Sequence, residues 1–265
     1  MASVKVPGGT IELFERGTGS RPVVLLHGFP LDHRVYDDQA AALADAYRVI
    51  TPDLRGFGQS LADEPFTIES LADDVHAALE QVGALPCVLG GLSMGGYVAL
   101  AYVMKYPTDL KGLVLNDTKA DADSTEAKAG RLKMVETCRQ GGARAVADQM
   151  QPKMLADATL KGRPDVVARL RSIMEACPPK TIENALLAMR DREDYVSKLA
   201  SIAVPTLLIF GEHDAITPPS TGQFMNREIP HSKLEVIPAA GHVASIEQPE
   251  KVTAALRAFL PGCFR

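Results

Sequence analysis

The stretch Val88-Leu89-Gly90-Gly91-Leu92-Ser93-Met94-Gly95-Gly96 decides the fold of this chain. An apolar run ends abruptly in the pattern Gly-x-Ser-x-Gly, and a helix-forming segment follows, which predicts a strand, a sharp turn and a helix. Because such a turn forces strained backbone angles on the serine, the residues two positions before and after it must be small. The pattern predicts a serine hydroxyl at the carboxyl end of a sheet, although a glycine-rich turn with an idle serine would also produce it.

The length and composition indicate one large α/β domain, or such a domain with an insertion. The chain has 265 residues, of which 46% are hydrophobic and 23% are charged, as in an ordinary globular protein. Its formal net charge of −5 and the lack of a basic run argue against a nucleic-acid-binding surface.

We expect a cytoplasmic protein that does not interact with a membrane. The N-terminal residues lack the long apolar core of a signal peptide, and no apolar run approaches the roughly 18 residues that a membrane-spanning helix needs. The cysteines lack the paired spacing of a metal site, which predicts reduced thiols and no bound metal. They are Cys87, Cys138, Cys177 and Cys263, of which Cys87 is expected in the core.

Strand and helix patterns alternate along most of the chain, which predicts a mostly parallel sheet with helices on both faces. The expected strands cover residues 4–6, 10–15, 22–26, 48–52, 87–89, 110–115, 205–210 and 234–238. The expected helices of this part cover residues 35–46, 67–82, 93–106, 218–229 and 247–260.

The alternation breaks between residues 119 and 195, where no strand pattern is found. Helix without strand inside an α/β chain predicts an inserted helical cap, with core segments 1–118 and 196–265 on either side. Several methionines lie in this region, and their adaptable side chains suit either a core or an irregular ligand cavity. The four expected cap helices cover residues 124–140, 143–155, 164–176 and 181–190.

The residues that could activate Ser93 follow two later strands. A serine hydroxyl is a weak nucleophile at neutral pH, so it needs a base within hydrogen-bond reach and a third group that orients the base. Asp214 and His242 each come directly after an expected strand. The carboxyl ends of parallel strands share one edge of the sheet, where ligands bind in open α/β folds. The order Ser93, Asp214, His242 is that of the α/β-hydrolase triad.

With these motifs, the chain resembles the serine-hydrolase branch of the α/β-hydrolase fold, which includes small carboxylesterases, enol-lactonases and cofactor-free haloperoxidases, or perhydrolases. The resemblance covers essentially the whole chain, with the cap as the least matched part. Five ordered motifs carry it: His27-Gly28, the loop Asp53-x-Arg55-Gly56-x-Gly58-x-Ser60, the Ser93 turn, Gly211-x-x-Asp214 and Gly241-His242.

The resemblance implies a role for each of these residues. Ser93 would be the nucleophile, His242 the general base and acid, and Asp214 the orienting carboxylate, with Asp117 as the rival position for the acid. The backbone N–H groups of Phe29 and Met94 would form the oxyanion hole. The loops that contain His27, Asp53 and Arg55 would be structural. The candidates for residues that line the substrate pocket are Pro30, Met134 and Met150.

The resemblance also implies the reaction. Branches of this fold that form an alkyl-enzyme carry aspartate at the turn, so Ser93 indicates an acyl-enzyme formed without metal or cofactor. We expect a carboxylesterase for small-molecule esters with short to medium acyl or aryl groups, as a monomer or small homo-oligomer. Lactonase or perhydrolase activity is the alternative, the latter indicated by Phe29-Pro30. A small-molecule receptor on the same fold is the alternative of another class.

Overall fold

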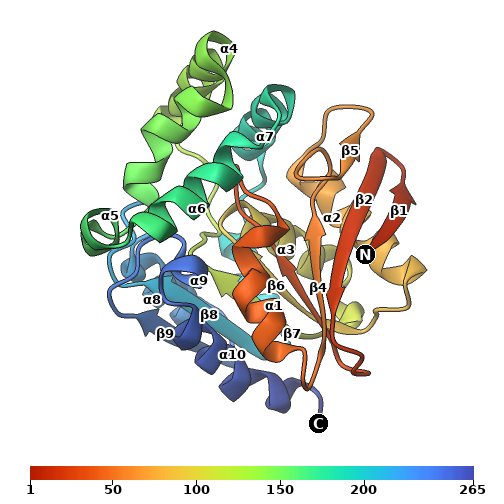
Figure 1. Ribbon diagram of the computed structural model, residues 1–265. Helices are drawn as coiled ribbons and strands as arrows, with labels where there is room; N and C mark the ends of the chain where they lie inside the picture. The colour runs from red at the N-terminus through yellow and green to blue at the C-terminus, as the bar shows by residue number, and fades with distance from the viewer.

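A twisted sheet of nine strands runs through the protein, for which a computed structural model describes residues 1–265 (Figure 1). The strand order is β1-β2-β4-β3-β6-β7-β8-β9, and the short β5 pairs with β2. Every pairing from β4 through β9 is parallel, whereas β2 pairs antiparallel with its neighbours. The strands are β1 (Ala2–Val6), β2 (Gly9–Arg16), β3 (Pro22–Leu26), β4 (Arg48–Asp53), β5 (Leu61–Ala62), β6 (Cys87–Leu92), β7 (Leu110–Asn116), β8 (Thr206–Gly211) and β9 (Ser232–Ile237).

The central strands are apolar throughout because helices cover both of their faces. In β3 every residue is buried. Val24 and Leu26 pack in one core cluster and Val23 and Leu25 in another, since successive side chains of a strand point to opposite faces. The sheet therefore separates two hydrophobic cores, as predicted from the continuous apolar runs.

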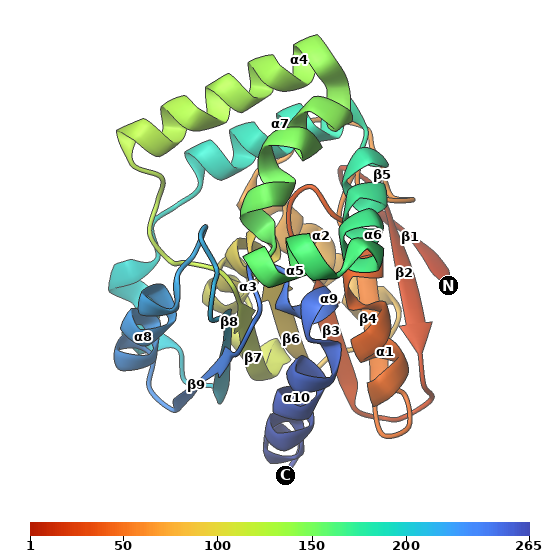
Figure 2. The ribbon, with the colours of Figure 1, turned by 60° about the vertical axis from the view of Figure 1, so that its left-hand side comes forward.

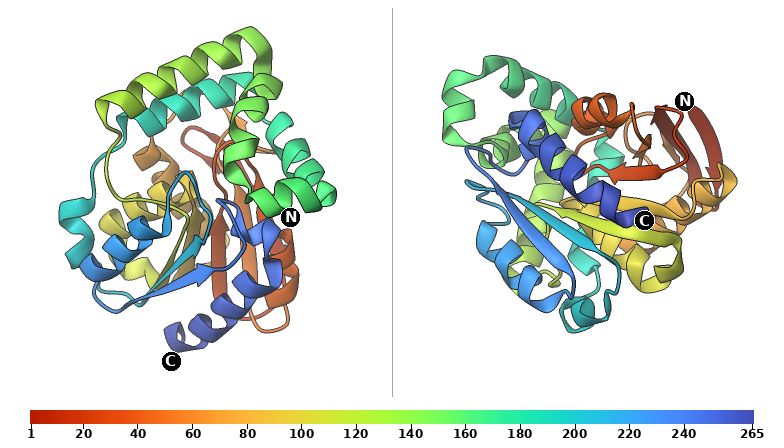
Figure 3. Two further views of the ribbon diagram at one scale, coloured as in Figure 1. Left: turned by 90° about the vertical axis from the view of Figure 1, so that its left-hand side faces the viewer. Right: turned by 90° about the horizontal axis from the view of Figure 1, so that it is seen from below.

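The helices of the core form a layer on each face of the sheet (Figures 1 and 3). One layer contributes to the larger core cluster and comprises α2 (Ile68–Gln81), α3 (Met94–Lys105) and α8 (Pro219–Glu228). The other comprises α1 (Asp37–Leu43), α9 (Ala244–Glu247) and α10 (Pro249–Cys263). The predicted α/β architecture with helices on both faces is thus confirmed.

The predicted helical insertion is also present, between β7 and β8, and its helices gather at one end of the sheet (Figure 2). It contains α4 (Thr125–Met154), α5 (Asp157–Gly162), α6 (Pro164–Glu175) and α7 (Pro179–Asp191). The backbone of α4 leaves the helical region at Gly142, with φ 65° and ψ −162°, so α4 consists of two helices joined at a kink. That kink lies between the two helices expected at 124–140 and 143–155.

The differences from the expected elements concern short pieces. The expected helix 35–46 is a 3₁₀ turn, His33–Tyr36, followed by α1, and β5, α5 and α9 were not expected at all. Two further 3₁₀ turns cover Pro107–Asp109 and Val196–Ser201. Elements of two to six residues are too short to show a hydrophobic period, so the sequence pattern could not reveal them.

The cysteines and the helices bear on two of the expectations, reduced thiols and no interaction with a membrane. All four cysteines are free and buried, and burial raises the pKa of the Cys87 thiol, as expected for an inert core residue. None of the helices combines the length and the apolar character that crossing a membrane would require.

Candidate active site

Ser93 stands at the apex of the turn between β6 and α3 with φ 52° and ψ −111°, a strained conformation for a residue with a side chain. The glycines around it are required by close packing. A Cβ on Gly91 would lie 2.1 Å from the carbonyl oxygen of Gly95, and one on Gly95 would lie 2.4 Å from that of Leu26. The Ser93 N–H donates to the carbonyl of Asn116 at 2.9 Å, which fixes the turn against the end of β7.

Asp214 and His242 form a buried pair at the ends of β8 and β9. His242 Nδ1 lies 2.8 Å from Asp214 Oδ2, and both side chains are at most 3% exposed. Asp214 also accepts hydrogen bonds from the N–H groups of Ile216 at 2.7 Å and Thr217 at 3.0 Å, and from the Thr217 hydroxyl at 2.6 Å. Burial alone would raise the pKa of Asp214, but attraction to His242 and these hydrogen bonds hold it below its usual value.

The expected hydrogen bond between Ser93 and His242 is not formed in this structure. The Ser93 side chain is half-buried, and its hydroxyl makes no hydrogen bond with His242 or with any other protein group. The carboxylate of Asp214 accepts the Nδ1 proton, so the free Nε2 of His242 has a lone pair available as a base.

Asp117, the rival acid, lies at the end of β7 with φ 43° and is fully buried. Its Oδ1 accepts the N–H of Gly211 at 2.7 Å, and it makes no hydrogen bond to a histidine. Burial, followed by the negative charge of the adjacent Asp214, raises the pKa of Asp117 well above its usual value. The geometry thus pairs His242 with Asp214 and leaves Asp117 beside that pair without a histidine partner.

The expected oxyanion donors have free N–H groups. Met94 is the first residue of α3, so its N–H has no acceptor within the helix. The N–H of Phe29 makes no hydrogen bond within the protein. The loop that carries Phe29 is held by His27, whose Nε2 accepts the N–H of Leu54 at 3.0 Å. The His27 proton is therefore on Nδ1, which donates to the Gly28 carbonyl at 2.9 Å, so His27 supports the loop.

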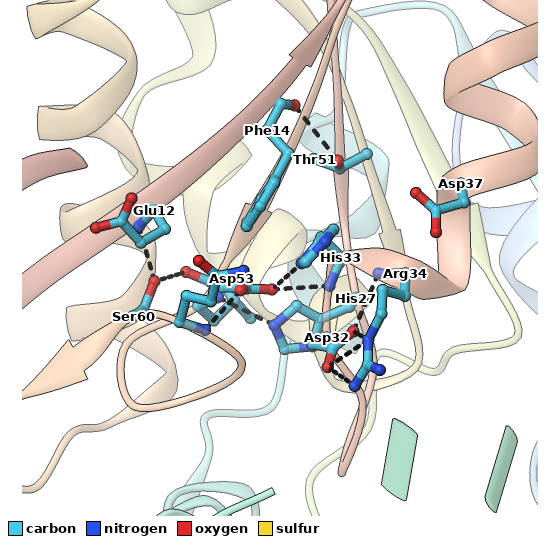
Figure 4. A network of polar contacts seen from close by, with 12 residues as sticks. Glu12, Phe14, His27, Asp32, His33, Arg34, Asp37, Thr51, Asp53 and Ser60 are labelled. Carbon is cyan, nitrogen blue, oxygen red and sulfur yellow. Dashed lines mark hydrogen bonds and ion pairs between the residues drawn. The ribbon is translucent and has the colours of Figure 1, made fainter. Parts of the chain in front are cut away.

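A polar network next to His27 is centred on the buried Asp53 (Figure 4). Asp53 Oδ1 accepts from the N–H and Nδ1 of His33, each at 2.8 Å, and Oδ2 accepts the N–H of Gln59 at 2.8 Å. Asp32, His33 and Asp53 could in principle offer ligand atoms to a cation, since these atoms lie within 4.8 Å of one another. Asp32, however, is engaged by Arg34 through contacts of 2.6 to 3.1 Å, so the arrangement is that of a hydrogen-bonded ion-pair network.

Two residues that support the site were missed by the sequence reasoning. Thr217 orients Asp214, and the buried Glu247 accepts the N–H of Gly241 at 2.6 Å and that of Ala156 at 2.9 Å. Glu247 thereby ties the His242 loop to the start of α5. Glu247 is the first residue of the expected helix 247–260, and no sequence pattern marks it as a residue that supports the site. Thr217 follows the expected acid Asp214 by three residues, so its role could have been predicted from that spacing.

A cavity of about 230 Å³ lies between the cap and the oxyanion loop. Met134 and Met150, two expected pocket residues, line it together with Phe29, whereas Pro30 does not. The complete lining is Phe29, Ala127, Gly130, Arg131, Met134, Met150 and Leu186. The sequence analysis did not identify Arg131, which is the single charged residue in this set.

Comparison with known proteins defines the class. Residues 21–249 match the family model of the alpha/beta hydrolase fold, so the chain belongs to that family. It is similar to a thermophilic esterase from Thermogutta terrifontis, solved with malate bound, with 40% identity, a TM-score of 0.96 and full coverage of both chains. It is 32% identical to a pimeloyl-[acyl-carrier protein] methyl ester esterase of Neisseria meningitidis, over 91% of this chain and 77% of the relative.

An enol-lactonase from Burkholderia xenovorans LB400 is a further structural relative, with 26% identity, a TM-score of 0.91, and coverage of 98% of this chain and 100% of the other. The expected resemblance to the esterase and enol-lactonase branch is thereby confirmed. The chain is a hydrolase of the alpha/beta fold.

Proposed function

We propose that this protein is a serine esterase that cleaves small-molecule carboxylic esters through an acyl-enzyme. The observation that carries the proposal is the pairing of His242 Nδ1 with Asp214 Oδ2 at 2.8 Å, on the same sheet edge as the strained Ser93. The similarity to two esterases supports it. In this proposal, residues 1–118 and 196–265 form the hydrolase core, and residues 119–195 form the cap.

In the proposed reaction, Ser93 Oγ bonds to the ester carbonyl carbon while its proton passes to His242 Nε2. Asp214 stabilises the imidazolium that forms, and the N–H groups of Phe29 and Met94 stabilise the negative oxygen. The C–O bond to the alcohol then breaks, and the alcohol leaves with the proton from His242. Water repeats the sequence on the acyl-enzyme and releases the acid.

The Ser93–His242 hydrogen bond must form during this cycle. Catalytic hydrogen bonds often tighten only when substrate is bound, so its absence here is compatible with the proposed roles.

The test is hydrolysis of p-nitrophenyl esters, from acetate to decanoate, by the wild type, Ser93→Ala and Ser172→Ala. Loss of the nucleophile is expected to lower kcat by about 10⁴- to 10⁶-fold. Ser172 is exposed on α6, so the matched variant should keep wild-type rates. Activity unchanged in Ser93→Ala would overturn the proposal, and no turnover in any of the three proteins would favour a receptor.

A lactone is the second candidate substrate. The structural similarity to an enol-lactonase favours it, and a lactone is an internal ester that the same acyl-enzyme chemistry opens. A ring-opening assay on simple five- and six-membered lactones with the same three proteins separates the two substrate classes.

A further inference from the structure

One charged side chain faces the otherwise apolar cavity above the oxyanion loop. Gly130, Arg131 and Met134 follow Ala127 by three, four and seven residues, so the four residues share one face of α4. Phe29, whose N–H is the proposed oxyanion donor, also lines this cavity. The cavity therefore adjoins a residue proposed to hold the reacting carbonyl, and Arg131 belongs to its α4 wall.

The hydrogen bonds of Arg131 leave most of its donors free. Its Nε donates to Asp123 Oδ2 at 2.9 Å, but the two terminal nitrogens donate to no protein acceptor. A guanidinium has five N–H donors, and the fork of its terminal nitrogens matches the geometry of a carboxylate. The side chain is 23% exposed, so these donors are reachable from the cavity.

The acid beside Arg131 is already shared with other cations. Asp123 Oδ1 accepts from the buried Arg192 at 2.6 Å and lies 3.9 Å from the ammonium group of Lys119. The nearby Asp194 is engaged by backbone N–H groups of Ala122 and Val196. The negative charge of Asp123 is therefore shared among Arg131, Arg192 and Lys119.

The cavity is open on the Gly130 side of α4. Gly130 is exposed, and a Cβ added to it would meet no atom within 4 Å. Of the seven residues that line the cavity, none is acidic, so nothing in the wall would repel an anion.

We propose that Arg131 binds a carboxylate at the distal end of the acyl group, so that the preferred substrates are half-esters of dicarboxylic acids. This inference rests on the proposed esterase function and assigns its substrate class. The ester carbonyl would lie at Phe29 and Met94, the acyl chain would cross the Met134 and Met150 walls, and the free carboxylate would meet the terminal nitrogens of Arg131.

The test compares the hydrolysis of monomethyl and dimethyl esters of succinic, glutaric and adipic acids. Hydrolysis is monitored by the release of acid. The measured quantity is the ratio of kcat/KM for the half-ester to kcat/KM for the diester of the same acid. A charge-assisted hydrogen bond changes affinity by about tenfold to a hundredfold, so Arg131→Met should lower this ratio by about that factor. The loss should be found in KM, and Arg131→Lys should recover part of it.

Controls separate binding from folding and from the proposed function itself. Arg144 is exposed on the part of α4 that follows the kink, makes no ion pair and lies outside the cavity lining, so Arg144→Met should keep the wild-type ratio. Equal ratios in the wild type and Arg131→Met, with both esters cleaved, would overturn the inference but leave the esterase proposal intact. Failure of the wild type to cleave either ester would instead contradict the proposed function.

Discussion

The sheet edge and the cap hold their functional groups in different ways. At the sheet edge, Asp214 receives two backbone N–H groups and a hydroxyl besides His242, and strand ends fix its position. In the cap, the side chain of Arg131 on α4 makes one hydrogen bond, to Asp123. A rigid edge suits chemistry that tolerates little displacement, whereas a weakly held cap wall can change without disturbing that chemistry. Under the proposed function, we therefore expect the sheet edge to set the reaction type and the cap to set the choice of substrate.

The two buried carboxylates at the edge give the largest expected contrast. Asp214→Asn places an amide where His242 Nδ1–H needs an acceptor, so we expect kcat for p-nitrophenyl acetate to fall by about 10³- to 10⁴-fold. Asp117→Asn keeps an oxygen for the Gly211 N–H and should lower kcat by less than about tenfold. If the larger loss follows Asp117→Asn, the assignment of the acid is wrong.

The same pair should differ in the pH dependence of stability. The pKa of Asp117 is raised on folding, so its contribution is present at low pH and is lost as the pH rises through the raised pKa. The pKa of Asp214 is lowered, so its contribution is present above the unfolded-state pKa and is lost as the pH falls through the lowered pKa. The Tm of Asp117→Asn, relative to the wild type, should therefore increase as the pH rises from the usual range of an aspartic acid through the raised pKa, and a constant difference would contradict a raised pKa of Asp117.

The attachment of the cap gives the next largest effect. Arg192 is buried, donates to Asp123 at 2.6 Å and to the Asp121 carbonyl at 2.6 Å, and covers the Tyr97 ring at 4.2 Å. These contacts join both ends of the insertion to α3, the helix that follows Ser93. Arg192→Met leaves Asp123 without its buried partner, which should lower the free energy of unfolding by about 3 kcal/mol.

The matched control for Arg192 is Arg190, two residues earlier, whose ion pair with Asp191 is half-exposed. Arg190→Met should cost less than about 1 kcal/mol in urea denaturation. Equal losses in the two variants would mean that the contacts of Arg192 do not anchor the cap.

The sequence predicted the edge better than the cap for a physical reason. The Ser93 turn needs glycines at fixed positions, and strands buried on both faces read as continuous apolar runs, so both leave strong local patterns. Glu247 acts through a contact between segments far apart in the chain, the hydrogen bond from Ala156, and Arg131 shares its cavity with the distant Phe29. Such contacts have no period and no fixed spacing, so a single sequence does not reveal them.

The smallest expected effects compare two glycines within α4. Gly130 has helical backbone angles and open space where a Cβ would stand, so Gly130→Ala should stabilise the protein by about 0.5–1 kcal/mol. Gly142 has the same open space but φ 65°, so Gly142→Ala should cost about 1 kcal/mol by straining the kink. Urea denaturation of both variants measures the difference. Because neither Cβ meets a neighbour, opposite signs would isolate backbone conformation as the cause, whereas equal signs would show that the kink at Gly142 is not maintained.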